Sequence, residues 1–131
     1  MPAEPYTAVD VEGAVRAWAR EAITGVSGRA YFAPNTRDGA LWPQLVLFRI
    51  RGPDEACMIQ FDIHTDSVHG KAIAETVRRE LVDKIALVNR YRHENTILHG
   101  ASVWDERWLP DLESGAARYV VEAYFTATAA S

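Results

Sequence analysis

Hydrophobic residues change their spacing several times along the chain, and each change predicts a new kind of secondary structure. Near the N-terminus they recur every three or four positions, as on one side of an amphipathic helix. They then alternate with polar residues, which is typical of a strand buried on one face, before the helical period and then the alternation return. The expected order is helix, strand, strand, strand, helix, strand, strand.

The first helix is expected to begin at Val11. Asp10 can accept hydrogen bonds from the free N–H groups of the first turn, and Glu12 adds favourable charge there. The Thr24-Gly25 pair predicts its end, because glycine readily adopts the left-handed conformation after a last turn. The stripe expected to be buried is Val11, Ala14, Val15, Trp18, Ala22 and Ile23.

Three strands are expected between the helices. A short strand at 28–33 precedes a loop at 34–43 that is rich in turn-forming residues. The segments 44–51 and 57–65 alternate and flank a tight turn at 52–55, so they predict an antiparallel hairpin. In its second strand, Cys57, Ile59, Phe61 and Ile63 share one face, and Met58, Gln60, Asp62 and His64 share the other.

A second helix follows, with Asp66 or Ser67 as its N-terminal cap, and extends to about Asn89. Apolar residues spaced by three or four predict its buried side. They are Ile73, Val77, Leu81, Ile85 and Val88.

The last third returns to strands at 96–104 and 117–127, joined by a polar excursion at 105–115. Gly100 interrupts the first of them and predicts a β-bulge. Together these elements predict an α+β domain, with two helices packed on one face of a mainly antiparallel sheet.

Composition agrees with one globular domain. The chain has 131 residues, 48% of them hydrophobic and 24% charged, and a formal net charge of -4. That length fits one domain, spanning 1–131, with 1–9 and 129–131 expected to be flexible. A single cysteine, Cys57, allows no internal disulfide. The sequence shows no secretion signal and no membrane-spanning stretch, so we expect folding in a cytoplasm without membrane contact.

Candidate chemistry is sparse. His64 and His69, like His93 and His99, lack the spacing of two ligands on one helix face, although Asp62 and Asp66 lie near the first pair. Cys57 is expected to be buried and inert, and Ser27, Ser67 and Ser102 lack a nucleophile-elbow sequence. No glycine-rich phosphate loop occurs. We therefore expect no enzyme activity, no cofactor and no metal.

Tryptophans in predicted loops favour an interaction role. Trp42, Trp104 and Trp108 lie in or beside such loops, and Arg107 precedes the last of them. Interfaces are enriched in tryptophan, tyrosine and arginine. A single loop tryptophan can fold back over its own core, but three together favour contact with another chain.

The layout resembles the tail terminator and tail-completion proteins of long-tailed (siphovirus-type) bacteriophages, particularly those of actinobacterial phages. The resemblance covers about 10–128 and depends on order and pattern. It is carried by the helix "VEGAVRAWAREAI", a loop ending in Trp-Pro, the hairpin "LVLFRIRGPDEACMIQFDIHT", the helix "HGKAIAETVRRELVDKI" and the closing strand "ARYVVEAYFTATA".

The resemblance implies a structural virion protein at the junction of tail and neck, assembled in the host cytoplasm. Such proteins form a ring, commonly a hexamer, that caps the tail tube and offers a docking surface to the head-tail connector or stopper protein. The tape measure protein is a further candidate partner, and DNA would pass through the lumen without specific binding. The contact elements would be 34–43, 52–55 and 105–115. The expected interface residues are Arg37, Asp38, Trp42, Asp54, Glu55, Trp104, Arg107 and Trp108.

Two alternatives stay open at this point. One is another neck or head-completion protein, which only its position in a particle would distinguish. The other is a small α+β enzyme or ligand-binding or metal-binding domain, with a pocket between the second helix and the sheet lined by Asp62, His64 and His69.

Overall fold

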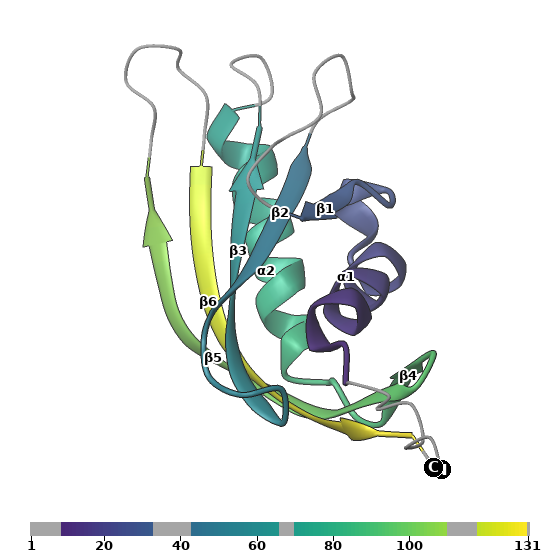
Figure 1. Ribbon diagram of the computed structural model, residues 1–131. Helices are drawn as coiled ribbons and strands as arrows, with labels where there is room; N and C mark the ends of the chain where they lie inside the picture. The colour runs from purple at the N-terminus through teal and green to yellow at the C-terminus, as the bar shows by residue number, and fades with distance from the viewer. Residues whose placement is uncertain (1–8, 33–42, 66–69, 110–117, 131) are drawn as a thin grey trace, which may run out of the picture.

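The computed structural model describes residues 9–32, 43–65, 70–109 and 118–130. Two helices lie on one face of a six-stranded sheet, as the sequence predicted (Figure 1). The elements are α1 (Val11–Ala22), a 3-10 turn η1 (Thr24–Val26), β1 (Ala30–Phe32), β2 (Gln44–Arg51), β3 (Ala56–His64), α2 (Gly70–Ile85), β4 (Tyr91–His93), β5 (Thr96–Trp108) and β6 (Arg118–Ala129).

The sheet has the order β1-β2-β3-β6-β5-β4. All neighbouring strands are antiparallel except β1 and β2, which run parallel, so the sheet is mixed but mainly antiparallel. The long strands β3, β5 and β6 curve around the helices, and α2 lies over the middle of the sheet (Figure 1). The fold class and the predicted hairpin are thereby confirmed.

Local sequence explains where α1 begins and how its end is held. The carboxylate of Asp10 accepts a hydrogen bond from Gly13 N at 3.0 Å, which confirms the predicted cap. After α1, Thr24 Oγ1 and Gly25 N donate to the two carboxylate oxygens of Glu80 in α2, at 2.6 and 2.8 Å. Glu80 therefore ties the end of one helix to the side of the other.

The core lies between the helices and the inner face of the sheet. Three aromatic rings form its centre: Trp18 of α1 packs edge-on against Phe61 and Phe125, with ring centroids 6.5 and 6.0 Å away. Edge-to-face packing at such distances is favourable beyond the area that it buries. The predicted inward residues of β3, from Cys57 to Ile63, are all fully buried.

The end of α2 differs from the expectation. The helix ends at Ile85, not near Asn89, because the next turn tightens into i to i+3 hydrogen bonds, from Leu87 N to Lys84 O and from Val88 N to Ile85 O. Val88 is still buried, with 7% of its surface exposed. The predicted cap residues of α2 lie outside the described residues.

Two strand predictions were incomplete. The short strand β4 was missed, and β5 extends through Trp108 where a polar excursion was expected. Its polar end stays in the sheet because its charges are paired with neighbouring elements: Glu106 with Arg78 of α2, and Arg107 with Glu122 of β6. The predicted bulge at Gly100 is confirmed by a register shift between Leu98 and Gly100.

Candidate interaction surface

The outer face of the sheet, which is the face opposite α1 and α2, carries the most distinctive surface of the described residues. Alternation sends every second side chain of β2, β3 and β6 to this side. Several of these side chains are apolar and deeply buried although no described helix covers them: Met58 is fully buried, and Val120 and Val46 are 1% and 3% exposed. The outer face is thus more apolar than an ordinary solvated sheet surface.

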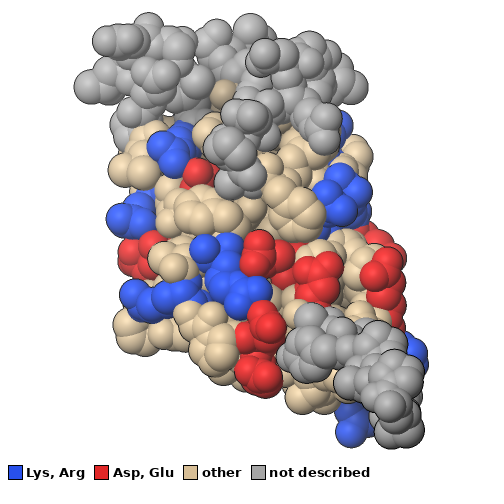
Figure 2. All heavy atoms as spheres, viewed as in Figure 1, with Lys and Arg blue, Asp and Glu red and all other residues tan. Residues whose placement is uncertain are grey.

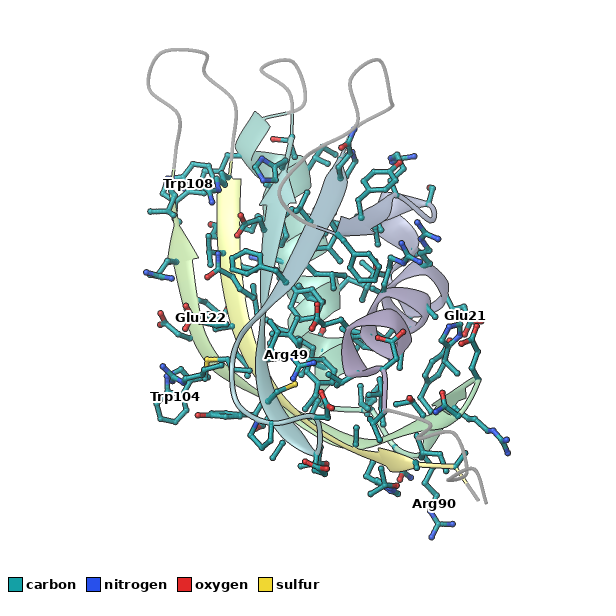
Figure 3. The ribbon with its side chains drawn as sticks, viewed as in Figure 1. Glu21, Arg49, Arg90, Trp104, Trp108 and Glu122 are labelled. Carbon is teal, nitrogen blue, oxygen red and sulfur yellow. The ribbon has the colours of Figure 1, made fainter. Side chains whose placement is uncertain are left out.

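We define the outer patch as Phe48, Ile50, Met58, Tyr124 and Trp104, from four neighbouring strands. Met58 pairs with Tyr124 across β3 and β6, and the Tyr124 ring meets Trp104 of β5 edge-on at 5.7 Å. The indole of Trp104 is 63% exposed and lies at the edge of the sheet (Figure 3). A large exposed ring supported from below by a second ring is typical of an interface anchor.

Charged side chains border this patch on β5 and β6. Arg107 bridges two carboxylates, with Nη2 at 2.9 Å from Glu122 and Nε at 3.3 Å from Asp105. Figure 2 shows positive and negative side chains interspersed across the middle of this view. Among the described residues, this surface is therefore a mixed charged border around apolar residues, with charges of both signs (Figure 2).

A buried carboxylate lies further along the same face. Asp62 is 6% exposed and accepts hydrogen bonds from Gln60 Nε2 at 2.9 Å and Arg118 Nη2 at 2.7 Å, with His64 Nε2 3.9 Å away. Burial by itself raises the pKa of Asp62, but its bonds with His64, Gln60 and Arg118 lower that pKa overall. The group is therefore a paired structural carboxylate that stays ionised.

The described histidines, His64, His93 and His99, do not converge on a metal or ligand site. Asp62 and His64 lie on the outer face, so the predicted alternative of a pocket between α2 and the sheet lined by these residues is wrong. His99 instead bonds Thr128 Oγ1 at 2.5 Å, and His93 lies 3.8 Å from Glu94. No group of three or more potential metal ligands occurs among the described residues, which exclude His69 and Asp66.

Cys57 is buried, as expected from the sequence. Its side chain is fully buried, and burial raises the pKa of the thiol to about 11. A thiol that stays protonated near neutral pH is a poor nucleophile.

Of the expected interface tryptophans, Trp104 and Trp108 both lie in β5, not in a loop. They face opposite sides, because a register shift between Val103 and Asp105 inserts an extra residue. Trp108 packs on Tyr119 of the inner face, with centroids 4.7 Å apart, and Lys71 Nζ lies 5.5 Å from its ring (Figure 3). Trp108 is thus partly engaged with its own domain.

The hairpin turn places two further expected residues. Asp54 is bonded to Arg49 at 2.8 Å, and Arg49 also binds Glu12 of α1 at 3.0 Å. Glu55 is exposed, and its backbone carbonyl accepts a hydrogen bond from Ala127 N. The turn is therefore bonded to α1 through Arg49 and to β6 through the backbone, with the side chain of Glu55 exposed on the surface.

Arg37, Asp38 and Trp42 lie outside the described residues. In contrast, the sequence did not single out Phe48, Ile50 and Tyr124 as contact residues on one sheet face. Their alternation signalled an outer face, but only the strand order β2-β3-β6-β5 brings these strands side by side, with Phe48 opposite Gln60 and Tyr124 opposite Met58. None of the helices within the described residues could span a membrane.

Comparison with known proteins gives a structural likeness but no sequence match. No protein-family model matches the chain, and no curated protein sequence matches it. The structure is similar to a chain in a solved structure of the virion of a native gene transfer agent (GTA) particle, with a TM-score of 0.59 and 14% sequence identity. The likeness covers 92% of this chain and 98% of that one, so the two chains share their fold over nearly their whole length.

Proposed function

We propose that this chain is a structural subunit of a phage-like virion, and that it forms the ring that caps the tail tube. The observation that carries the proposal is the likeness to a virion chain, which extends over almost the whole of both chains. A likeness confined to a common motif would leave much of either chain unmatched. A match over nearly all of both chains favours the interpretation that the same domain is used in a similar particle.

The outer patch supports a role in assembly. Trp104, Ile50 and Phe48 are apolar side chains on a sheet face that no described helix covers, with Trp104 63% and Ile50 38% exposed. An apolar patch with a mixed charged border is the usual anatomy of a protein interface. The proposed partners are further copies of the chain, the tail tube protein and the head-tail connector, with the tape measure protein as a further candidate.

A ring also requires two different complementary surfaces on each subunit. The outer patch is one candidate, and the hairpin turn with Asp54 and Glu55 is a second, separate surface. The net charge of -4 suits a ring through which DNA slides, since the chain has no surplus of basic residues to hold phosphates by counterion release.

The test is electron microscopy and mass measurement of the purified protein, alone and with tail tube protein. We expect rings with a central hole at the ends of the tubes. Trp104→Ala should weaken ring formation, whereas Leu87→Ala, which truncates another exposed side chain (71% exposed) after α2, should not. A protein that stays monomeric in both conditions and never binds tube ends would refute the proposal.

A further inference from the structure

One strand edge of the sheet is open over a long stretch. β5 pairs with β6 along most of its length, but with β4 only over Thr96–Leu98. Beyond that point, residues 99–108 of β5 have no second neighbouring strand within the described parts of the chain. An open edge presents unpaired backbone groups that can accept a strand from another chain.

The other described strand edges are shorter: residues 48–51 of β2 also lack a second neighbouring strand, but a register shift between Arg49 and Arg51 interrupts them. At the far side of the sheet, β1 has three residues, and the carbonyl of Ala30 already accepts a hydrogen bond from Arg20 Nε at 3.0 Å. β4 also has three residues. β5 is therefore the edge at which a further strand could form the longest ladder.

The backbone register shows which groups face outward. Leu109 N donates to Arg118 O at 2.8 Å, so Leu109 belongs to a hydrogen-bonded pair with β6. Such pairs alternate along antiparallel strands with pairs whose N–H and C=O groups point away. By this alternation Asp105 and Arg107 bond toward β6, while the N–H and C=O groups of Glu106 and Trp108 point to the open edge.

Little in the sequence of this edge prevents strand addition. Residues 99–108 contain no lysine and no proline, which commonly block exposed edges. The bulge at Trp104 confines the regular part to 105–108. The charges there are balanced within the chain: Glu106 binds Arg78 at 2.6 Å, and Arg107 binds Glu122 and Asp105.

We propose that a second copy of this chain adds its own β5 to this edge. The two β5 strands would run antiparallel, related by a two-fold axis that passes between the two Glu106 residues. In that register Asp105 lies opposite the partner's Arg107, and Arg107 lies opposite the partner's Asp105. These two pairs are of the non-hydrogen-bonded kind, in which facing side chains are closest. The side chains of Asp105 and Arg107 are 46% and 50% exposed, so they are accessible to a partner.

The same register satisfies the outward backbone groups of Glu106 on both copies. The two Glu106 side chains would face each other, but each is neutralised by Arg78 of its own chain. Trp104, beside the edge, would lose part of its exposure.

A two-fold contact uses the same surface on both copies, so it differs from the head-to-tail contact of a ring. We therefore assign it to the form of the protein before ring assembly, in which it covers an edge prone to aggregation.

Charge reversal tests the register. Asp105→Arg places arginines opposite each other, and Arg107→Asp does the same with aspartates, so each variant alone should dimerise at least about tenfold more weakly than wild type. An equimolar mixture should form a heterodimer, because both pairs between positions 105 and 107 are again of opposite charge. Light scattering and native mass spectrometry over a concentration series measure the association of wild type, of each variant and of the mixture. A wild-type chain that stays monomeric throughout, or a mixture that does not associate, would overturn the proposal.

Proline substitution tests the backbone edge independently. Glu106→Pro removes an N–H that points outward, whereas Glu106→Ala keeps it, and both variants lose the ion pair with Arg78. We expect the alanine variant to dimerise and the proline variant to be monomeric. Equal dimerisation of the two would contradict strand addition. These masses are measured without tail tube protein, so loss of the dimer and loss of tube-end rings are separate results.

Discussion

Trp18 and Trp104 illustrate how one residue type serves two purposes in this protein. Trp18 is 6% exposed and packs against Phe61 and Phe125 at the centre of the core. Trp104 is 63% exposed and rests on Tyr124 at the border of the sheet. The first contributes to folding, and we infer that the second contributes to assembly.

Replacing Trp18 tests its role in the core. Trp18→Ala should lower the free energy of unfolding by about 3–5 kcal/mol, because it removes a large buried ring and leaves a cavity between α1 and the sheet. Urea denaturation followed by circular dichroism measures this. Trp104→Ala is the control. Apart from the loss of its contact with Tyr124, this exposed substitution should change the free energy of unfolding by no more than about 0.5 kcal/mol. Similar losses in both variants would contradict the difference between the two sites.

Glu80 gives a prediction on pH. Burial raises its pKa, but the hydrogen bonds from Gly25 and Thr24 lower it overall below the ordinary value. A lowered folded-state pKa contributes stability that is present above the unfolded pKa of about 4.3 and is lost as the pH falls through the folded pKa. The protein should therefore lose stability below about pH 5, and Glu80→Gln should flatten that loss.

Urea denaturation between neutral and acidic pH measures the effect, with Asp83→Asn, an exposed carboxylate on the same helix, as the control. Near neutral pH, Glu80→Gln should cost about 1–2 kcal/mol, since hydrogen bonds to a charged acceptor are replaced by bonds to a neutral one. Identical pH profiles for wild type and Glu80→Gln would show that the link between η1 and α2 does not depend on the charge.

At the scale of elements, the hairpin of β2 and β3 depends on Gly52. This residue has φ of +98°, and a Cβ at its position would lie 2.5 Å from Ala56 O and 2.8 Å from Cys57 Cα. Gly28 also has a positive φ, of +79°, but a Cβ there would meet nothing within 4 Å. An alanine would be strained at either position, and the two positions differ in the space available for its Cβ.

Gly52→Ala should therefore destabilise the protein more than Gly28→Ala. The cost at Gly28 should be about 1–2 kcal/mol, the price of a left-handed conformation for a residue with a side chain. At Gly52 the clash with backbone atoms adds to it. Thermal unfolding of the two variants compares them, and equal shifts in melting temperature would contradict the proposed clash.

The hairpin and both helices could be predicted because local pattern and tertiary packing agree there. In β2 and β3 the alternation and the turn residues indicate the same structure, and the buried stripe of α1 includes Trp18 as predicted. The end of β5 could not be predicted, because Glu106 and Arg107 remain in the sheet through ion pairs with α2 and β6. No local pattern encodes partners so distant in sequence.

The candidate surface was predictable only in part. The sequence indicated Trp104 and Trp108 as contact residues, but a one-residue register shift between them sends their side chains to opposite faces. The position of a bulge depends on the pairing with β6 and not on β5 alone. Likewise, Ile50 and Tyr124 lie on one surface only because the strand order places β3 between β2 and β6.

At the scale of the whole molecule, two distinct types of contact are proposed. The outer patch and the hairpin turn would build a ring, and the open edge of β5 would hold two copies together before the ring forms. Both use the sheet, while α1 and α2 close the core on its other side (Figure 1). Within the described residues, this division leaves one sheet face and one edge for assembly.

The central claim is that this chain ends the growth of a tail tube, and tube length measures it most directly. Tail tube protein is assembled with and without the chain, and the lengths are measured by electron microscopy. We predict that tubes assembled with the chain carry a ring at one end and stop growing there, whereas tubes without it continue to lengthen. Equal length distributions, with tube ends free of the protein, would contradict the account.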